Sequence, residues 1–128
     1  MIMPVYRFED LPDVQHNPGL SSNRGETIKG ERMYFAHRRR PAGTEAKPHH
    51  HPNEQFIYVL KGREKFWLDG VEHVVGPGDV IHVPANTVHA TLALEDMETI
   101  YVKDTSWGLK GVPAGEKAPE AMPPDDPF

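Results

Sequence analysis

The chain has 128 residues and a mass of 14.4 kDa, which is the size of a single domain. Hydrophobic residues make up 38% of it, but no stretch approaches the ~20 apolar residues of a membrane span, so a transmembrane protein is excluded. The absence of cysteine excludes disulfides, thiolate zinc sites and cysteine nucleophiles. A formal charge of -5 offers nucleic acid no general attraction, so a small-molecule partner is favoured.

Residues 1–30 are polar and interrupted by proline and glycine, and only residues 5–8 indicate a short strand. We interpret this segment as an N-terminal arm laid over the rest of the protein. Arg7, Glu9 and Asp10 stand where a signal peptide would have its apolar stretch. A cytoplasmic location is therefore expected.

Residues 31–107 are predicted to form an all-β domain, because short apolar runs alternate with turn signals. Asp69-Gly70 is a favoured type I′ hairpin pair, since both central residues of that turn need positive φ. Tight turns are also predicted at residues 76–79 and 84–86. The predicted strands cover residues 33–39, 55–60, 63–68, 72–75, 80–83, 89–93 and 99–103.

Residues 108–128 contain five prolines and almost no apolar periodicity. We expect an extended or disordered Pro-rich tail. Such a composition is typical of solvated chain, and the alternative is a segment that covers the mouth of the domain or a partner subunit.

Three consecutive histidines, His49 to His51, lie between two prolines that disfavour a helix. In an extended chain alternate side chains share a face, so His49, His51 and, four residues after His51, Gln55 point the same way. Asn53 joins them, and the apolar Ile57 and Val59 continue this face. The pattern predicts a polar cluster at the end of an interior apolar stripe.

Two imidazoles and an amide oxygen on one face can bind one cation, with a fourth ligand from elsewhere in the chain. His89, which follows the turn at residues 84–86, is the candidate for that ligand. Glu54 competes with Gln55, but it falls on the opposite face. His50 and His82 are interpreted as structural or outward-facing.

Two segments resemble the two motifs of the cupin superfamily. Gly43, His49-x-His51, Gln55 and Gly62 have the spacing of G-x5-H-x-H-x3,4-E-x6-G, with Gln in place of Glu. The second motif, G-x5-P-x-G-x2-H-x3-N, is similar to the segment that contains Gly78, Pro84, Asn86, His89 and Ala93. Asn86 replaces a glycine but tolerates the left-handed conformation, and Ala93 replaces an asparagine that is not a ligand.

The resemblance implies a double-stranded β-helix, or jelly-roll, barrel with one divalent metal ion. The implied ligands are His49, His51, Gln55 and His89, and Fe, Mn, Ni and Zn all remain open. A neutral Gln leaves the bound ion at a net charge of +2, which strengthens its Lewis acidity and favours an anionic or enolisable substrate. The resemblance also implies a homodimer.

Four residues are candidates for binding a substrate. In the run Arg38-Arg39-Arg40 alternation allows either Arg38 with Arg40, or Arg39, to face inward, and a guanidinium there could pair with a carboxylate. Solvated side chains at a strand end are the alternative. Aromatic residues could line a pocket for a planar substrate, although aromatics on strands more often form plain core. The substrate-binding candidates are Arg39, Tyr34, Trp67 and Tyr101.

Three functions remain open. The first is a dioxygenase that acts on a phenolic, diketone or enolisable-acid substrate chelated by the metal. The second is a redox-neutral lyase, cyclase or isomerase, which needs a protein acid or base near the metal. The third is a module that binds a small molecule without turning it over.

Overall fold

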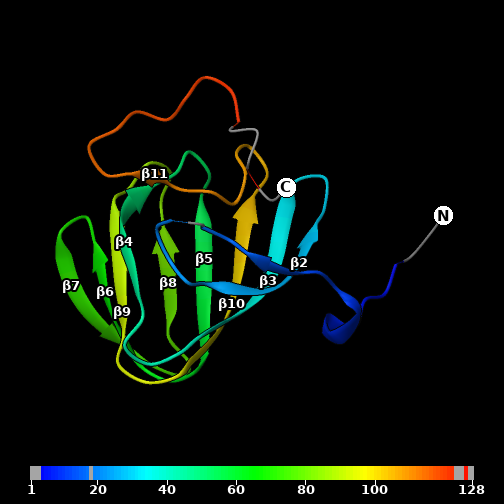
Figure 1. Cartoon of the computed structure of the whole chain (residues 1–128), viewed down its shortest axis with the longest axis horizontal. Coiled ribbons are helices and arrows are strands. Elements are labelled where there is room, and N and C mark those ends of the chain that lie inside the picture. The colour runs from blue at the N-terminus through cyan, green and yellow to red at the C-terminus, as the bar shows by residue number, and fades with distance from the viewer. Residues whose placement is uncertain (1–3, 18, 123–125, 127–128) are drawn as a thin grey trace.

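The computed structural model describes residues 4–17, 19–122 and 126, and its regular elements are strands and one short 3-10 helix (Figure 1). The fold is all-β. The elements are η1 (Phe8–Asp10), β1 (Asp13–Gln15), β2 (Arg24–Lys29), β3 (Met33–Arg40), β4 (Glu45–His50), β5 (Gln55–Lys61), β6 (Glu64–Leu68), β7 (Val71–Val75), β8 (Val80–Val83), β9 (His89–Ala93), β10 (Met97–Asp104) and β11 (Val112–Pro113).

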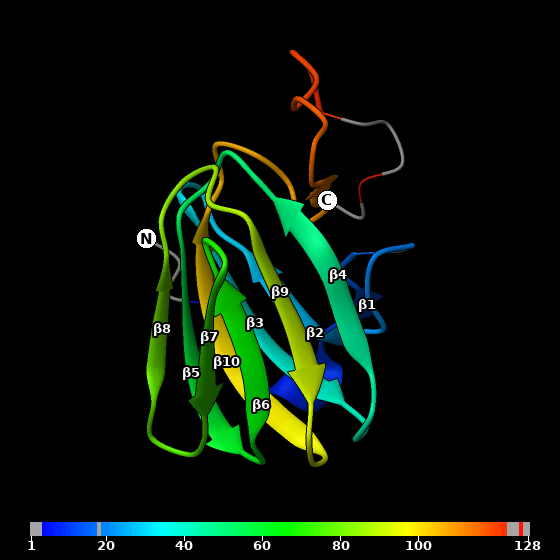
Figure 2. The same cartoon turned by 90° about the vertical axis from the view of Figure 1, so that its left-hand side faces the viewer.

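Two antiparallel sheets face each other. The larger has the strand order β1-β2-β3-β10-β5-β8, and the smaller has the order β11-β4-β9-β6-β7. Figure 2 shows the smaller sheet in front of the larger one. Neighbouring strands in each sheet are often far apart in the sequence, which is the connectivity of a jelly roll. The predicted jelly-roll barrel is confirmed.

All seven predicted strands are present, with ends that differ from the prediction by at most two residues. The hairpin between β6 and β7 turns at Asp69 and Gly70, whose φ angles of 50° and 79° are those of the predicted type I′ turn. Asn86 has a φ of 60°, so it takes the left-handed conformation expected of it. Gly62 has a φ of 82°, and a Cβ there would lie 2.2 Å from the carbonyl oxygen of Asp96.

The N-terminal residues are part of the barrel, whereas the sequence suggested an arm laid over it. β2 pairs with β3 and β1 pairs with β2, so both extend the larger sheet. A Cβ on Gly25 would lie 1.8 Å from the carbonyl oxygen of His37, which explains a glycine at this close strand approach. The predicted strand over residues 5–8 is wrong, because this stretch is irregular chain that leads into η1.

The C-terminal residues also return to the barrel. Leu109 is 1% exposed and belongs to the core cluster, and β11 pairs with the end of β4. The backbone N–H of Ala114 donates to the carbonyl of Pro48. The segment after β10 is therefore extended, as predicted, but it is bound to the barrel up to at least residue 114. Residues 123–125 and 127–128 of the predicted tail lie outside the described residues.

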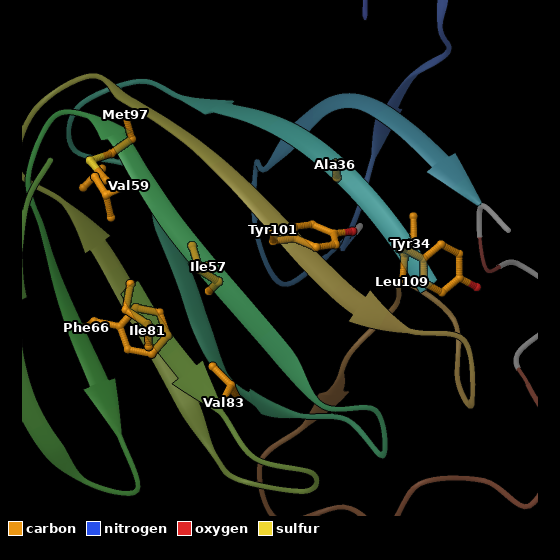
Figure 3. Packing of buried hydrophobic residues seen from close by; sticks show 11 residues of the cluster. Tyr34, Ala36, Ile57, Val59, Phe66, Ile81, Val83, Met97, Tyr101 and Leu109 are labelled. Atoms are coloured by element: carbon orange, nitrogen blue, oxygen red, sulfur yellow. The ribbon is translucent and has the colours of Figure 1, made fainter. Parts of the chain in front are cut away.

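The core fills the space between the two sheets (Figure 3). Aliphatic and aromatic side chains of β5, β6 and β8 form one part, including Val59, Phe66 and Val83, each at most 1% exposed. Tyr34 and Tyr101, from β3 and β10, join the cluster together with Leu109. The alternate residues that face inward on β5 therefore run from this apolar core up to Gln55.

Among the described residues, no helix has the length and apolar character needed to cross a membrane.

Candidate metal centre

The predicted alternation of side chains around the histidine run is observed. His49 is the second-last residue of β4 and Gln55 is the first residue of β5. His49, His51 and Gln55 are all buried. Glu54 is exposed, and its carboxylate accepts a hydrogen bond of 2.7 Å from the ring of His82. The structure therefore places the competing carboxylate outside the barrel.

His89 meets the histidine run from the opposite strand. It begins β9 and is the register partner of His49, and their ring centroids lie 4.2 Å apart. The rings of His51 and His89 are 5.0 Å apart. One ring nitrogen from each of the three histidines lies within 4.8 Å of the others, a grouping that could hold a metal ion.

A backbone carbonyl fixes the tautomer of each histidine. Nδ1 of His49 lies 2.6 Å from the carbonyl oxygen of Lys47, and Nδ1 of His51 lies 2.8 Å from that of Asn53. The same contact joins His89 to the carbonyl of Thr87 at 2.8 Å. A carbonyl only accepts, so each Nδ1 carries the hydrogen and each Nε2 keeps its lone pair. This is how metal-binding histidines are commonly oriented.

Burial keeps the three rings neutral. It lowers the pKa of His49 to about 4 and that of His89 to about 3, and it lowers the pKa of His51 well below the ordinary value. The Nε2 lone pairs are therefore free of protons at pH 7. Nε2 of His51 is buried and has no hydrogen-bond partner. An unpartnered buried acceptor beside two similar nitrogens is what a site for a divalent ion requires, so this donor set fits such an ion.

The histidines open into a small cavity of about 30 Å³ between the sheets. This volume holds only about two water molecules. Gln55 lines the cavity with the histidines, so its amide oxygen is available as the fourth predicted ligand. The remaining lining comes from the segment before β2, from β3, β4, β5, β6, β9 and β10, and from the segment after β10: His16, Asn17, Asn23, Arg38, Arg40, Ala46, Ile57, Glu64, Phe66, Thr91, Tyr101, Lys103 and Leu109.

Of the three consecutive arginines, Arg38 and Arg40 face the cavity, and Arg39 does not. Arg39 lies on the outer face of β3, where its guanidinium donates two hydrogen bonds, of 2.8 and 3.0 Å, to Glu26. Its expected contact with a substrate is therefore not supported by its position. Arg40 pairs with the carboxylate of Glu64 and with the hydroxyl of Thr91 inside the barrel.

The three aromatic candidates lie at different places in the barrel. Tyr101 lines the cavity and is 1% exposed. Tyr34 is buried in the core but does not line the cavity. Trp67 lines a different groove, on the smaller sheet, together with Pro48 and Ala90. That groove also includes His89. Of the four predicted substrate-binding residues, only Tyr101 lines the cavity that contains all three histidines.

Lys103 is a cavity residue that the sequence analysis did not single out. It is 4% exposed, it is the register partner of Gln55, and its ammonium donates to the carbonyl oxygen of Leu109 at 3.3 Å. Burial, with a further contribution from the nearby Arg38, lowers the pKa of Lys103 to about 7. Alternation from the inward Tyr101 would have placed Lys103 inside, but a lysine near a strand end is usually solvated.

Both ends of the chain close the cavity, and sequence reasoning missed this closure. Asn17 and Leu109 line it, and the backbone N–H of Gly111 donates to the side-chain oxygen of Asn17 at 2.8 Å. A Cβ on Gly111 would lie 2.7 Å from Cδ2 of His49, so the C-terminal segment lies directly on the site. Asn53 holds this segment in place, because its amide nitrogen donates to the carbonyls of Asp104, Trp107 and Gly108.

Fold and site together define a jelly-roll protein with a buried cluster of three histidines that could hold a metal ion. The sequence profile of the cupin domain matches residues 37–103, which contain both histidine motifs. The chain therefore belongs to the cupin family.

One curated relative matches over a short segment. Quercetin 2,3-dioxygenase of Bacillus subtilis is 43% identical over 51 residues, which are 39% of this chain and 15% of the dioxygenase. The aligned part thus spans only a small fraction of that enzyme.

Solved structures match over most of the barrel. KdgF from Halomonas sp. has a TM-score of 0.69 at 22% identity, covering 80% of this chain and 94% of KdgF. The polyketide cyclase RemF from Streptomyces resistomycificus has a TM-score of 0.67 at 23% identity, covering 80% of each chain. A predicted oxalate decarboxylase from Thermotoga maritima has a TM-score of 0.65 at 18% identity, covering 79% of this chain and 98% of the other. These similarities show the fold.

Proposed function

We propose that the protein is a metal-dependent enzyme of the dioxygenase type that activates a small organic substrate at one divalent ion. The observation that carries the proposal is the set of three neutral, buried imidazoles with converging Nε2 atoms. The local similarity to a quercetin dioxygenase supports the reaction type. Such an ion would supply Lewis acidity toward an enol or phenol oxygen and, if it is iron, an electron source for O2.

The residues of the chain would have three roles. His49, His51 and His89 hold the ion through Nε2, and the amide oxygen of Gln55 completes the set. Because all four ligands are neutral, the bound ion keeps its full charge and stabilises an anionic substrate oxygen. The cavity walls from both chain ends exclude bulk water, which strengthens this electrostatic effect.

A redox-neutral lyase, cyclase or isomerase is the second candidate, and Lys103 is the observation that favours it. This function needs a protein acid or base near the metal, and a cavity lysine with a pKa of about 7 is suited to that role at neutral pH. The Nζ of Lys103 would accept a proton from the substrate and return it to a neighbouring atom.

Metal analysis and two assays test these candidates. The protein is purified without added metal, its metal content is measured, and turnover of phenolic, diketone and enolisable-acid substrates is followed with an oxygen electrode and under anaerobic conditions. Iron together with oxygen uptake supports the dioxygenase. Turnover without oxygen supports the second candidate, and tight ligand binding without turnover would contradict both.

A further inference from the structure

Two basic side chains of the cavity, the buried Lys103 and the partly buried Arg38, have no carboxylate at ion-pair distance among the described residues. Arg38 and Lys103 line the cavity with the histidines, yet neither forms an ion pair with a carboxylate in the described part of the chain. Holding basic groups away from water without a counter-ion is costly, and the lowered pKa of Lys103 reflects that cost. Packing therefore does not explain these two side chains, and a bound anion would favour the charged form of both.

The two cations lie around one aromatic ring. The guanidinium carbon of Arg38 is 4.7 Å from the ring centroid of Tyr101, and Nζ of Lys103 is 5.8 Å from it. Arg38 uses its Nε to donate to the hydroxyl of Thr99 at 3.3 Å. Lys103 donates one hydrogen bond, to the carbonyl of Leu109. Each cation therefore keeps further N–H groups for a ligand.

The other charged groups do not neutralise this pair. Glu64 is the carboxylate that lines the cavity among the described residues, and it is bound to Arg40. Asp104 accepts hydrogen bonds from the backbone of Glu54 and Ser106. Asp126 accepts them from the backbone of Leu109 and Lys110 and acts on Lys103 only through its longer-range field. With neutral histidines, the cavity is thus cationic inside a chain of net charge -5.

We propose that Arg38 and Lys103 form a carboxylate-binding subsite beside the metal centre, so that the substrate is a small carboxylic acid. Its carboxylate binds the two cations while a second oxygen reaches the metal. This inference rests on the proposed function. The cavity of about 30 Å³ is too small for a fused-ring substrate, and even a small acid enters only if the side chains that line it move.

The test uses the full chain loaded with Mn²⁺ and two probes of nearly equal shape, pyruvate and its neutral methyl ester. Binding of each is measured by isothermal titration calorimetry, after the manganese content has been measured. We expect the wild-type protein to prefer pyruvate by roughly tenfold or more, the effect of a hydrogen bond to a charged group. Equal affinity for the two probes would overturn the subsite, whereas failure to bind manganese would contradict the metal centre itself.

Three variants test whether Arg38 and Lys103 cause the preference for pyruvate over its methyl ester. Arg38→Gln and Lys103→Met each remove one cation and should lose most of the preference for pyruvate while keeping bound manganese. Arg39→Gln, a neighbour that faces outward, is the matched control and should keep both. Unchanged preference in a folded Arg38→Gln or Lys103→Met variant would overturn the subsite. If circular dichroism shows that neither variant folds, the two probes are compared on the metal-free wild-type protein, where the ion cannot cause the preference, and equal affinity there would overturn the subsite.

Discussion

At the residue scale, each imidazole of the candidate metal centre is oriented by a backbone carbonyl that lies close to it in the sequence. The carbonyl that fixes each ring lies two residues from its histidine, at Lys47, Asn53 and Thr87. The ligands therefore keep their tautomer without help from distant residues. Only their convergence depends on the sheet, through the pairing of β4 with β9.

His51→Ala tests this convergence. We expect the variant to lose metal affinity by about 100-fold or more, because even groups that only orient a ligand contribute 10–100-fold. His50→Ala is the matched control. The ring of His50 points away and contacts the carbonyl of Glu116 at 2.7 Å, so this variant should bind metal normally. Metal content after dialysis measures both, and equal losses would contradict the assignment of faces.

At the element scale, the sequence contained the signals for most of the barrel. Asp69-Gly70 predicted one hairpin, and the alternation from His49 to Val59 predicted which side chains of this stretch are buried. The strands β1 and β2, the outermost pair at one edge of the larger sheet, were not predicted, because Gly25 and the neighbouring polar residues suppress the strand pattern. Leu109 was assigned to a solvated tail because one apolar residue among glycines carries no periodicity. The sequence did not show whether Arg38 or Arg39 faces inward, because this depends on how β3 pairs with β10 and local sequence does not reveal that pairing.

Gly111→Ala tests the contact between the C-terminal segment and the site. The added Cβ would meet His49 and the amide nitrogen of Asn17 at 2.7 and 2.9 Å, so the segment must shift. We expect a loss of about 1–3 kcal/mol in the free energy of unfolding, as for other overpacked sites, together with weaker metal binding. Urea unfolding measures the first effect. Ala114→Ser, at an exposed position of the same segment, is the control and should change neither the free energy of unfolding nor metal binding. A Gly111→Ala variant that behaves like the wild type would contradict close contact between this segment and His49.

At the scale of the whole molecule, an acidic chain folds around a cationic interior. The outer face of the larger sheet carries exposed apolar side chains that are neighbours by register, including Phe56, Tyr58 and Val80. Soluble monomers rarely expose such contiguous patches, and a two-fold pair of chains would bury this one. The homodimer stays a prediction, as do the division into arm, barrel and tail and the compartment.

Buried neutral histidines predict that the metal-free protein loses stability in mild acid. The folded-state pKa values of His16, His49 and His89, about 3, 4 and 3, lie below the unfolded value of about 6.5. The unfolded state therefore binds more protons as the pH falls below about 6.5, and each histidine costs at most roughly 1.4 kcal/mol per pH unit down to its folded-state pKa.

Urea unfolding in the presence of a chelator, between pH 7.5 and 4.5, measures this loss. The free energy of unfolding should fall steadily below pH 6.5. Above pH 7 it should still rise with pH, because the folded-state pKa of Lys103, about 7, lies below its ordinary value of 10.5. His16→Gln should reduce the slope, because this histidine is buried but is not a ligand candidate. His82→Gln, at an exposed position, is the control and should leave it unchanged. A profile without slope in this range would contradict neutral buried histidines.

The hydrogen bond between Asn17 and Gly111 spans 94 positions of the chain. During synthesis on the ribosome, the strands that carry the histidines emerge after Asn17 but before the C-terminal residues that cover them, such as Leu109 and Gly111. The nascent barrel is consequently exposed to ions of the surrounding solution until translation has passed residue 111, and the choice of ion can be made before the centre is enclosed.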